Sequence, residues 1–464
     1  MALHLDLTEL FSDNDNDLRL SHNEAMALFA SAEEARNQHL LNKPKWRELG
    51  HLRDHLLACQ ERAAFVKANQ EIDNFVVFGI GGSALGSSAI MGALGPIYQN
   101  LQLEHNSPQV FVIDSVDPDW LSEFFEKINL ERTHINVISK SGGTIETSAQ
   151  FLLAFDRVLS ACDGDRERCI SHFTITTDQK SGHFRSFCDE ENFSTLAVPE
   201  GVGGRFSVLS SVGLFTSEMA GFDTESMLQG AARVADSLAN CEALKDPALW
   251  YALMHTAYMD KSLDKHVHFA YGHRLRLLCD WYSQLWAESL GKRTNIFGEQ
   301  VCIGPTPISA VGPTDQHSQS QLYVDGPKDK VFTMLKVKEF NSRVDLPKTF
   351  VDSPAFTHLE NGSLNDLMER EREGTMVALI EEQSPVCVIE LCKLDAFHLG
   401  QYFMFMQITT AYAGGILKIN PFDQPGVEAG KVAALALMGC AGYESRAEEI
   451  RRIFDKSKSF KLSC

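Results

Sequence analysis

The stretch INVISKSGGTIETSAQ, residues 135–150, is the part of the chain that decides the expected fold. Its first four residues are typical of a short buried strand, and an apolar helix is expected to begin near Ser148. The turn between them carries three hydroxyls, a lysine and a glycine pair, at Ser139, Lys140, Ser141, Gly142, Gly143 and Thr144. Backbone N–H groups, hydroxyl donors and the positive end of a helix dipole converge in such a turn, which is therefore a candidate anion site. An ordinary strand-to-helix turn with serine and threonine caps is the alternative.

Alternating strands and helices surround this stretch, from Asn74 to about Pro199. Short β-rich runs occur at Phe75–Phe78, Val110–Ile113, Ile135–Ile138 and Phe173–Thr176, and helical patterns at Ser83–Leu94, Pro118–Lys127 and Thr144–Leu159. This alternation predicts a parallel sheet with helices on both faces. Ligands of such sheets bind beyond the carboxyl ends of the strands. The turns at 79–86 and 139–147 are therefore expected to lie side by side.

The length of 464 residues suggests roughly two or three domains. We expect residues 1–50 to form an N-terminal helical arm, residues 51–221 a first α/β domain, and residues 222–464 a second α/β domain with a C-terminal helix. Residues 304–319 are rich in proline and glycine, and we expect them to form a stiff loop.

The composition excludes several classes of protein. A formal charge of −20 argues against a nucleic acid or an anionic membrane as partner. Eleven cysteines without a Cys-x-x-Cys pair indicate reduced thiols in a cytoplasmic protein, and neither a disulfide framework nor a zinc site. The sequence shows neither a signal peptide nor an apolar run long enough to span a membrane.

Several single residues are candidates for chemistry. Arg205 lies in a glycine-rich turn, and Gln284 and Glu288 share one face of a predicted helix with apolar neighbours, a setting that suits a general base. His317 ends the proline-rich segment, and Lys431 follows a helix start at Pro425. Each of these residues also has an ordinary interpretation without a function. Arg205 could be a surface arginine, Glu288 a solvent-facing glutamate, and Lys431 a solvated lysine. His317 is one of 16 histidines, most of which must be ordinary.

The turn GIGGSALG, residues 79–86, formally matches the dinucleotide-binding fingerprint with Ala84 in its third position. The nearest acid at a strand end, Asp114, comes 30 residues after Ala84 (114 − 84), where about 20 is usual. We therefore favour a turn in which glycine lets the backbone approach a small ligand and Ser83 supplies a hydroxyl donor.

Taken together, six motifs resemble those of the glucose-6-phosphate isomerase family, in the family's order. They are GIGGSALG (79–86), SKSGGTIET (139–147), VGGRFS (202–207), AESLGK (287–292), GPTDQH (312–317) and DQPGVEAGK (423–431), and the resemblance covers roughly residues 70–440. It implies an α/β fold of two sugar-isomerase-type doubly wound domains with mostly parallel sheets, plus the N-terminal helical arm.

The resemblance also implies roles for individual residues. Ser139, Lys140, Ser141 and Thr144 match the phosphate cradle, Gly82 and Ser83 the sugar-facing turn, and Gln284 and Gln424 the substrate-contacting glutamines. Arg205 matches the active-site arginine, Glu288 the proton-transferring base, His317 and Lys431 the ring-opening pair, and Glu146 a glutamate that supports the histidine. This chain departs from the family's pattern at two places. Many members have threonine where this chain has Ser141, and they have bulkier residues where it has Gly142 and Gly143.

The function implied is the reversible isomerisation of D-glucose 6-phosphate and D-fructose 6-phosphate through a cis-enediol(ate), in glycolysis and gluconeogenesis. The family needs neither a metal nor another cofactor, and it acts as a homodimer in which the histidine reaches the partner's site. Two alternatives remain at this point: a non-catalytic sensor of sugar phosphates that uses the same cradle, and an NAD oxidoreductase suggested by residues 79–84.

Overall fold

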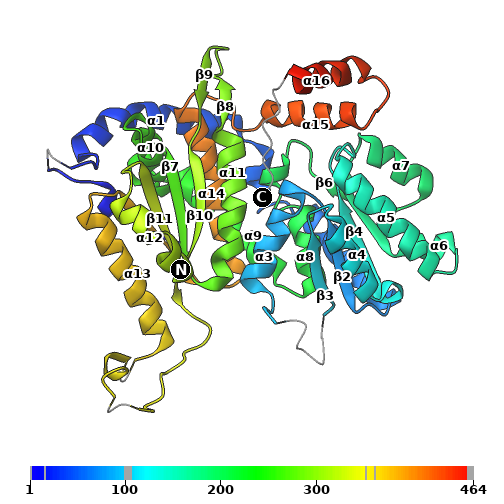
Figure 1. Cartoon of the computed structure of the whole chain (residues 1–464), viewed down its shortest axis with the longest axis horizontal. Helices are drawn as coiled ribbons and strands as arrows, with labels where there is room; N and C mark the ends of the chain where they lie inside the picture. Colours follow the sequence, from blue (N-terminus) through cyan, green and yellow to red (C-terminus); the bar gives the residue numbers. More distant parts are fainter. Residues whose placement is uncertain (1–2, 15–16, 99–106, 351–352, 360–361, 457–464) are drawn as a thin grey trace.

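Two five-stranded sheets lie side by side, each covered by helices on both faces, in the computed structural model of the chain (Figure 1). The structure describes residues 3–14, 17–98, 107–350, 353–359 and 362–456. The expected α/β fold with mostly parallel sheets is confirmed.

The first sheet has the strand order β3-β2-β4-β5-β6, and all of its pairs are parallel. Its strands are β2 (Asn74–Phe78), β3 (Gln109–Ile113), β4 (Thr133–Ile138), β5 (Phe173–Asp178) and β6 (Ser194–Val198). Every residue of β4 is buried, which explains its continuous apolar character. The helices of this half are α2 (Asp54–Asn69), α3 (Leu85–Leu94), α4 (Pro118–Lys127), α5 (Ile145–Ala161), α6 (Arg166–Ser171), α7 (His183–Glu191) and α8 (Ser211–Ala220).

The second sheet has the order β1-β12-β11-β7-β10, with β1 antiparallel and the other strands parallel. Its strands are β1 (His4–Asp6), β7 (Lys265–Tyr271), β10 (Thr306–Gly312), β11 (Lys330–Glu339) and β12 (Val386–Lys393). Its helices are α9 (Thr224–Asn240), α10 (Pro247–Asp260), α11 (Arg276–Leu290), α12 (Thr314–Asp325), α13 (Leu364–Glu381) and α14 (Ala396–Ile416). The order reverses at β7 as it reverses at β2, so the four parallel strands of the second sheet have the same order as β3-β2-β4-β5 of the first.

The N-terminal segment does not stand apart as an arm. Strand β1 pairs with β12 at the edge of the second sheet, and helix α1 (His22–Asn42) packs against α10 and α14. The side chains of Ala25, Phe29 and Ala32 form the buried face of α1. Burial of that face fixes residues 1–50 to the second half, apart from residues 1–2 and 15–16, which lie outside the described residues.

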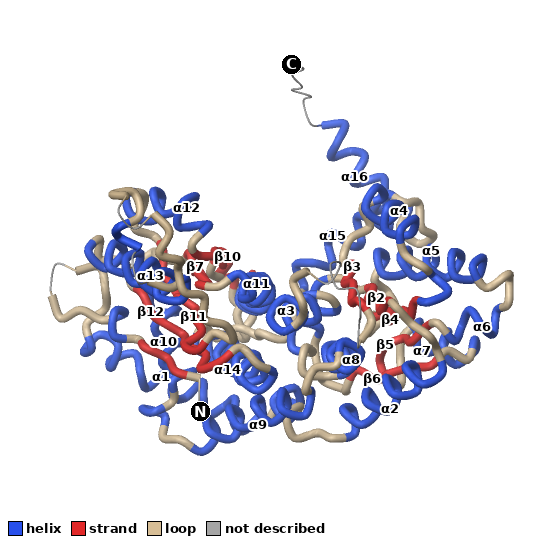
Figure 2. The backbone as a smooth tube through the Cα atoms, turned by 90° about the horizontal axis from the view of Figure 1, so that it is seen from below, coloured by secondary structure: helices blue, strands red, loops and turns tan. Residues whose placement is uncertain are grey.

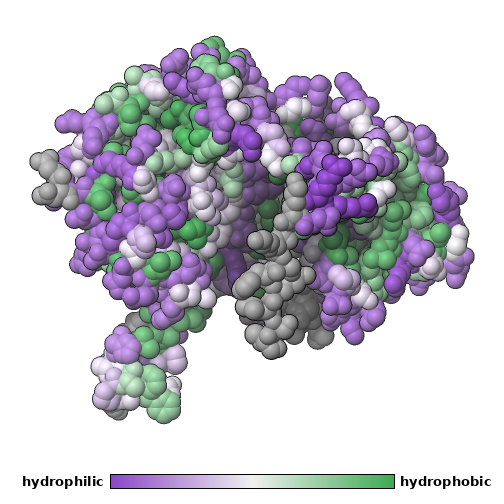
Figure 3. Space-filling view, turned by 45° about the horizontal axis from the view of Figure 1, so that its top comes forward, coloured by the Kyte–Doolittle hydropathy of each residue, from purple (hydrophilic) through white to green (hydrophobic). Residues whose placement is uncertain are grey.

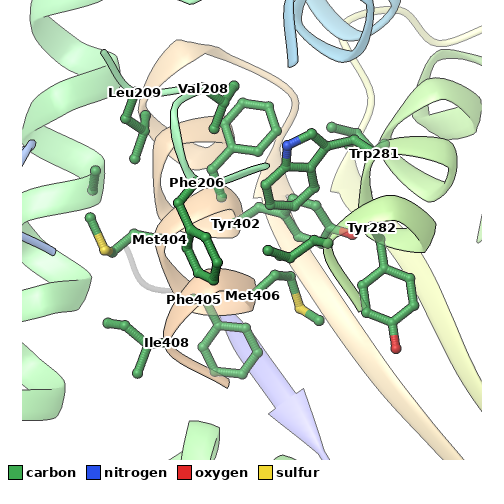
Figure 4. Close-up of a cluster of buried hydrophobic side chains, with 14 of the residues drawn as sticks. Phe206, Val208, Leu209, Trp281, Tyr282, Tyr402, Met404, Phe405, Met406 and Ile408 are labelled. Carbon is green, nitrogen blue, oxygen red and sulfur yellow. The ribbon is translucent and has the colours of Figure 1, made fainter. Parts of the chain in front are cut away.

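Helix α14 lies at the centre of the molecule, where it packs against α1, α9, α10 and α11. All but three of its residues are buried, which is why it is apolar on every side. It belongs to a core that contains residues of both sheets. Figure 4 shows part of this core, in which Phe206, Trp281 and Met404 come from three separate segments. The two halves are therefore joined by a shared hydrophobic core.

The expectation of a stiff loop at 304–319 is wrong, since most of this segment is strand β10 followed by helix α12. Strand β10 pairs only with β7 and so forms an edge of the sheet, where Pro307 does not interrupt a second ladder. The prolines of this segment therefore made a strand look like a loop in the sequence.

Three short elements complete the chain: the antiparallel hairpin β8 (Lys292–Thr294) and β9 (Gln300–Ile303), and helices α15 (Pro425–Leu437) and α16 (Glu444–Lys456). Among the described residues, no helix is long and apolar enough to cross a membrane. The described cysteines are free thiols, and Cys464 lies outside the described residues.

Candidate active site

The site lies where the carboxyl ends of the first sheet face the second half of the molecule. Strands β2 and β4 are neighbours, so the turns that follow them lie side by side as expected. Strand β3 lies on the other side of β2, and the strand order reverses at this point. Open α/β sheets bind ligands at such a switch point.

Two glycines allow three segments to meet here. The short helix η3 (Gly81–Ser83) lies against a second short helix, η6 (Gly204–Phe206). A Cβ on Gly82 would lie 2.3 Å from the carbonyl carbon of Gly204. Gly81 has a φ of +55°, and a Cβ there would lie 2.9 Å from Nε2 of Gln284 on α11. Only glycine fits at these two positions, and Ser83 closes the same turn.

Arg205 is the buried centre of the site, with 4% of its surface exposed. Its Nε donates a hydrogen bond to Oγ of Ser289 at 2.7 Å. Its Nη2 donates to the backbone carbonyl oxygens of Pro421 at 2.6 Å and Asp423 at 3.0 Å. These partners fix the plane of the guanidinium, because its donors form a rigid fork.

Glu288 lies on the last turns of α11, directly beside that guanidinium. Its Oε1 is 3.0 Å from Nη1 of Arg205, and its Oε2 accepts a hydrogen bond from Nε2 of Gln284 at 3.0 Å. Nη1 of Arg205 also donates to Oε1 of Gln424 at 3.1 Å. The structure therefore brings Arg205, Gln284, Glu288 and Gln424 together, as the sequence predicted, and it holds both oxygens of the carboxylate.

Burial and nearby charges shape the electrostatics of this cluster. Burial lowers the pKa of Arg205 from its ordinary value, and the carboxylates of Glu288 and Asp423 oppose that change. The guanidinium nevertheless stays protonated in proteins. A fixed positive charge next to a carboxylate can stabilise negative charge that develops on a bound substrate.

The turn after β4 presents hydroxyls and backbone amides at the start of α5. Oγ of the buried Ser139 accepts a hydrogen bond from the N–H of Gly142 at 3.1 Å and lies 3.5 Å from Oγ1 of Thr144. Oγ of Ser141 accepts from the N–H of Gly143 at 3.1 Å. Thr144 is the N-cap residue of α5, yet its side chain makes no capping hydrogen bond. The N-terminus of this 17-residue helix therefore offers uncapped N–H groups to an anion.

The side chain of Lys140 binds the backbone of a neighbouring segment. Its Nζ donates a hydrogen bond to the carbonyl oxygen of Val202 at 2.9 Å. Val202 precedes the glycine pair that leads to Arg205. In this structure Lys140 therefore connects the turn after β4 with η6.

Among the described residues, Lys431 forms no hydrogen bond or ion pair with Glu288. It lies on α15, where its Nζ is 2.9 Å from Oε1 of Glu428, and half of its side-chain surface is exposed. Helices α15 and α16 pack on each other through a small cluster of their own, Ala433, Ala436, Tyr443, Ala447 and Ile450. Figure 1 shows this pair projecting from the edge of the molecule. In the segment that leads into α15, Gln424 at its start binds Arg205.

His317 and Glu146 lie in opposite halves of the molecule. His317 is exposed on the first turns of α12, and no other described residue forms a hydrogen bond or ion pair with its ring. Glu146 lies on the first turn of α5. Figures 1 and 2 both place α5 and α12 on opposite sides of the molecule. The expected support of the histidine by Glu146 is therefore not formed within one chain.

The glycines of the turn at 79–86 make contacts within the protein. A Cβ on Gly86 would lie 2.8 Å from Cγ2 of Val208, and the space beside Gly82 is filled by the backbone of η6. Close packing within the protein therefore accounts for these glycines without a dinucleotide. In the part of the chain that the structure describes, no group of three or more His, Cys, Asp or Glu residues is placed to hold a metal.

Two residues of the site were missed in the sequence, Ser289 and Lys292. Ser289 accepts from Arg205, and Lys292 is buried with its Nζ donating to the carbonyl oxygens of Glu288 at 2.8 Å and Asp423 at 2.7 Å. A signal was present, because both lie in the motif AESLGK, and a lysine just after a helix often binds its last carbonyls.

Comparisons with known proteins agree with this arrangement. The sequence model of the phosphoglucose isomerase family matches residues 48–457. The chain is 36% identical to a glucose-6-phosphate isomerase of Carboxydothermus hydrogenoformans, over 89% of this chain and 90% of that one. It is 38% identical to one of Rubrobacter xylanophilus, over 88% and 91% of the two chains.

The fold of this chain also matches the folds of two solved structures. A crystal structure of a hypothetical protein from Thermus thermophilus superposes with a TM-score of 0.82 at 30% identity, covering 95% of this chain and all of that one. A glucose-6-phosphate isomerase from Chlamydia trachomatis superposes with a TM-score of 0.76 at 21% identity, covering 94% and 90%, and supports the fold alone. On its sequence match over most of its length, the chain belongs to the phosphoglucose isomerase family.

Proposed function

We propose that this chain interconverts D-glucose 6-phosphate and D-fructose 6-phosphate through a cis-enediol(ate), as an enzyme of glycolysis and gluconeogenesis. The observation that carries the proposal is the pair of Glu288 and Arg205, whose carboxylate and guanidinium lie 3.0 Å apart between the two halves of the molecule. The names of the relatives from Carboxydothermus hydrogenoformans and Rubrobacter xylanophilus support the same reaction.

The turn after β4 binds the phosphate in this proposal. The hydroxyls of Ser139, Ser141 and Thr144 and the amides at the start of α5 surround it, and Lys140 adds a positive charge to the same turn. These local donors outweigh the net charge of −20, because distant charges are screened over about 8 Å. Phosphate binding then positions the reacting carbons, which lie beside Gly82 and Ser83.

Glu288 transfers the proton between C1 and C2 on one face of the enediolate. Arg205 stabilises the negative charge that grows on the substrate oxygen, a contribution worth about 2.7–4 kcal/mol for one donor in other enzymes. Gln284 orients the carboxylate through its hydrogen bond. Gln424 binds Arg205, and both glutamines contact the sugar in this proposal.

Ring opening needs an acid and a base at the ring oxygen and the anomeric hydroxyl, roles that we assign to His317 and Lys431. Because His317 and Glu146 lie in opposite halves of one chain, we infer a homodimer in which each His317 reaches the partner's site and meets Glu146 there. We further infer a cytoplasmic enzyme, in keeping with its free cysteines.

A coupled assay on the purified protein tests the function. Fructose 6-phosphate is supplied, and the glucose 6-phosphate formed is detected through its dehydrogenase. Turnover is expected. Binding of the sugar phosphate without turnover would instead identify a non-catalytic sensor.

The Glu288→Gln substitution tests the assignment of the base. The amide cannot accept the proton, so kcat is expected to fall about 10²- to 10⁴-fold. Affinity for a sugar phosphate, measured by calorimetry, is expected to stay within a few-fold, because the phosphate is held elsewhere. Glu33→Gln on the exposed side of α1 is the matched control. A Glu288→Gln enzyme with normal kcat would exclude Glu288 as the base.

A further inference from the structure

Lys292 is a buried lysine with an unusual position. It is the first residue of β8, directly after Gly291 at the end of α11, and 7% of its surface is exposed. Lysine is rarely buried unless its charge is partnered. Its Nζ donates hydrogen bonds to the carbonyl oxygen of Glu288 at 2.8 Å and to that of Asp423 at 2.7 Å. It also lies 3.5 Å from Oδ1 of Asp423.

These bonds connect the two segments that carry the proposed chemistry. The carbonyl of Glu288 lies in the last turn of α11, where it has no partner within the helix. Asp423 directly precedes Gln424, at the start of the chain that leads into α15. One ammonium group therefore sets the spacing between the carboxylate-bearing turn and the segment 421–424.

Arg205 shares this anchor. Its Nη2 donates to the same carbonyl oxygen of Asp423 at 3.0 Å, so two cations bind one acceptor. Burial and the charge of Arg205 lower the pKa of Lys292, and the carboxylate of Asp423 opposes that change. The carbonyl of Pro421 binds Arg205 alone. Without Lys292, Arg205 would be the one described side chain that still donates a hydrogen bond to the carbonyl oxygen of Asp423.

We propose that Lys292 is a positioning residue for proton transfer, which holds residues 421–424 at a fixed distance from Glu288 without touching the substrate. The proposal rests on the isomerase function proposed above. If the segment loosens, Gln424 shifts and water gains access to the carboxylate of Glu288. A proton held on that carboxylate then exchanges with solvent instead of returning to the substrate, because an open site no longer excludes water.

The Lys292→Met substitution tests this role, because it keeps the apolar stem and removes the ammonium. Lys330→Met is the matched control: Lys330 is also buried, and its Nζ donates to the carbonyl oxygen of Pro327 at the amino end of β11. Two quantities are measured with glucose 6-phosphate deuterated at C2, namely kcat/KM and the fraction of label retained in the product. The label fraction is counted per turnover, so it does not depend on how much of the sample is folded.

For Lys292→Met we expect kcat/KM to fall about 10- to 100-fold, as small misplacements near reacting groups do. We also expect the label lost to solvent to rise at least twofold. Lys330→Met should lower the unfolding temperature while leaving the label fraction at the wild-type value. If Lys292→Met does not fold, Lys292→Gln takes its place, since its amide can reach one carbonyl but not both.

Unchanged label retention in a folded Lys292 variant would overturn the positioning role while leaving the isomerase function intact. An equal rise in label loss for Lys330→Met would also overturn it, because any buried lysine would then have the same effect. A wild-type protein without isomerase activity would overturn both proposals, and the assay on the wild-type protein detects this case separately.

Discussion

At the scale of single residues, the site depends on what surrounds Arg205. Its donors bind one hydroxyl, one amide oxygen, one carboxylate and two backbone carbonyls. Those carbonyls belong to Pro421 and Asp423, more than 200 positions away in the sequence. The orientation of the guanidinium is therefore set by the meeting of the two halves, and not by its own turn alone.

Arg205→Lys tests whether this orientation matters beyond the charge. Lysine keeps the positive charge but has no fork, so it cannot bind Ser289 and the carbonyls while facing Glu288. We expect kcat to fall about 10²- to 10³-fold, the loss found when one preorganised donor is removed. Steady-state kinetics provide the measurement, with Arg276→Lys at the exposed start of α11 as control. Full activity of Arg205→Lys would mean that charge alone is sufficient.

The sequence predicted part of this environment and missed the rest. The motifs named Arg205, Gln284, Glu288 and Gln424, and the structure brings their side chains together. Ser289 and Lys292 were missed although both lie within a quoted motif. The reason is physical: the two hydrogen bonds of Lys292 go to backbone carbonyl oxygens, and a carbonyl group leaves no signature in the sequence.

At the scale of elements, the contact between η3 and η6 decides how closely the turn after β2 approaches the turn that carries Arg205. Strand β2 delivers η3 from the first sheet, and η6 carries Arg205. Their backbones touch at Gly82 and Gly204, with no side chain between them. The position of Arg205 relative to the turn after β2 therefore depends on the lack of a side chain at Gly82.

The Gly82→Ala substitution is expected to separate these turns. The new Cβ would meet the backbone of Gly204 at 2.3 Å and the nitrogen of Arg205 at 2.6 Å, and backbone atoms cannot move aside as a side chain can. We expect the free energy of unfolding to fall by about 1–3 kcal/mol, as for overpacking elsewhere, together with a loss of kcat. Urea unfolding and the coupled assay measure the two effects.

Gly203→Ala is the control, because a Cβ at Gly203 meets nothing within 4 Å and its φ of −76° suits alanine. It should leave both stability and kcat close to those of the wild-type chain. Equal losses for the two variants would show that the close contact at Gly82 is not the cause.

The buried strands were predictable, whereas the two edge strands of the second sheet, β1 and β10, were not. The buried strands β2, β4 and β5 read as continuous β-rich runs because both of their faces are covered. Strand β10 was mistaken for a loop because an edge strand tolerates proline. Strand β1 is only three residues long, and so short a run carries too little pattern to be recognised.

At the scale of the whole molecule, most charged side chains lie at the surface, and the core also contains uncharged polar groups. Hydrophilic side chains cover most of the face in Figure 3, in keeping with the 22% of charged residues. The core, in contrast, contains neutral histidines. His266 and His268 of β7 are both buried, and His268 Nε2 is hydrogen-bonded to the hydroxyl of Tyr402 at 2.9 Å.

These histidines make the stability of the whole fold sensitive to acid. Burial lowers the pKa of His266 and of His268 to about 3, from an ordinary value of 6.5. Below pH 6.5 the unfolded chain therefore binds protons that the folded chain does not. The stabilisation is complete above pH 6.5 and is lost as the pH falls toward 3.

His268→Gln removes one of these titrating groups and should flatten the dependence on pH. Between pH 7 and pH 5 the variant is expected to lose about 2 kcal/mol less unfolding free energy than the wild-type chain, the value for one proton taken up. Urea unfolding at pH 7, 6 and 5 gives this difference. Tyr402→Phe is the control, since it removes the same hydrogen bond but keeps the imidazole: its stability should be lower at every pH, with the wild-type slope. If His268→Gln also kept the wild-type slope, His268 would not be a source of the acid sensitivity.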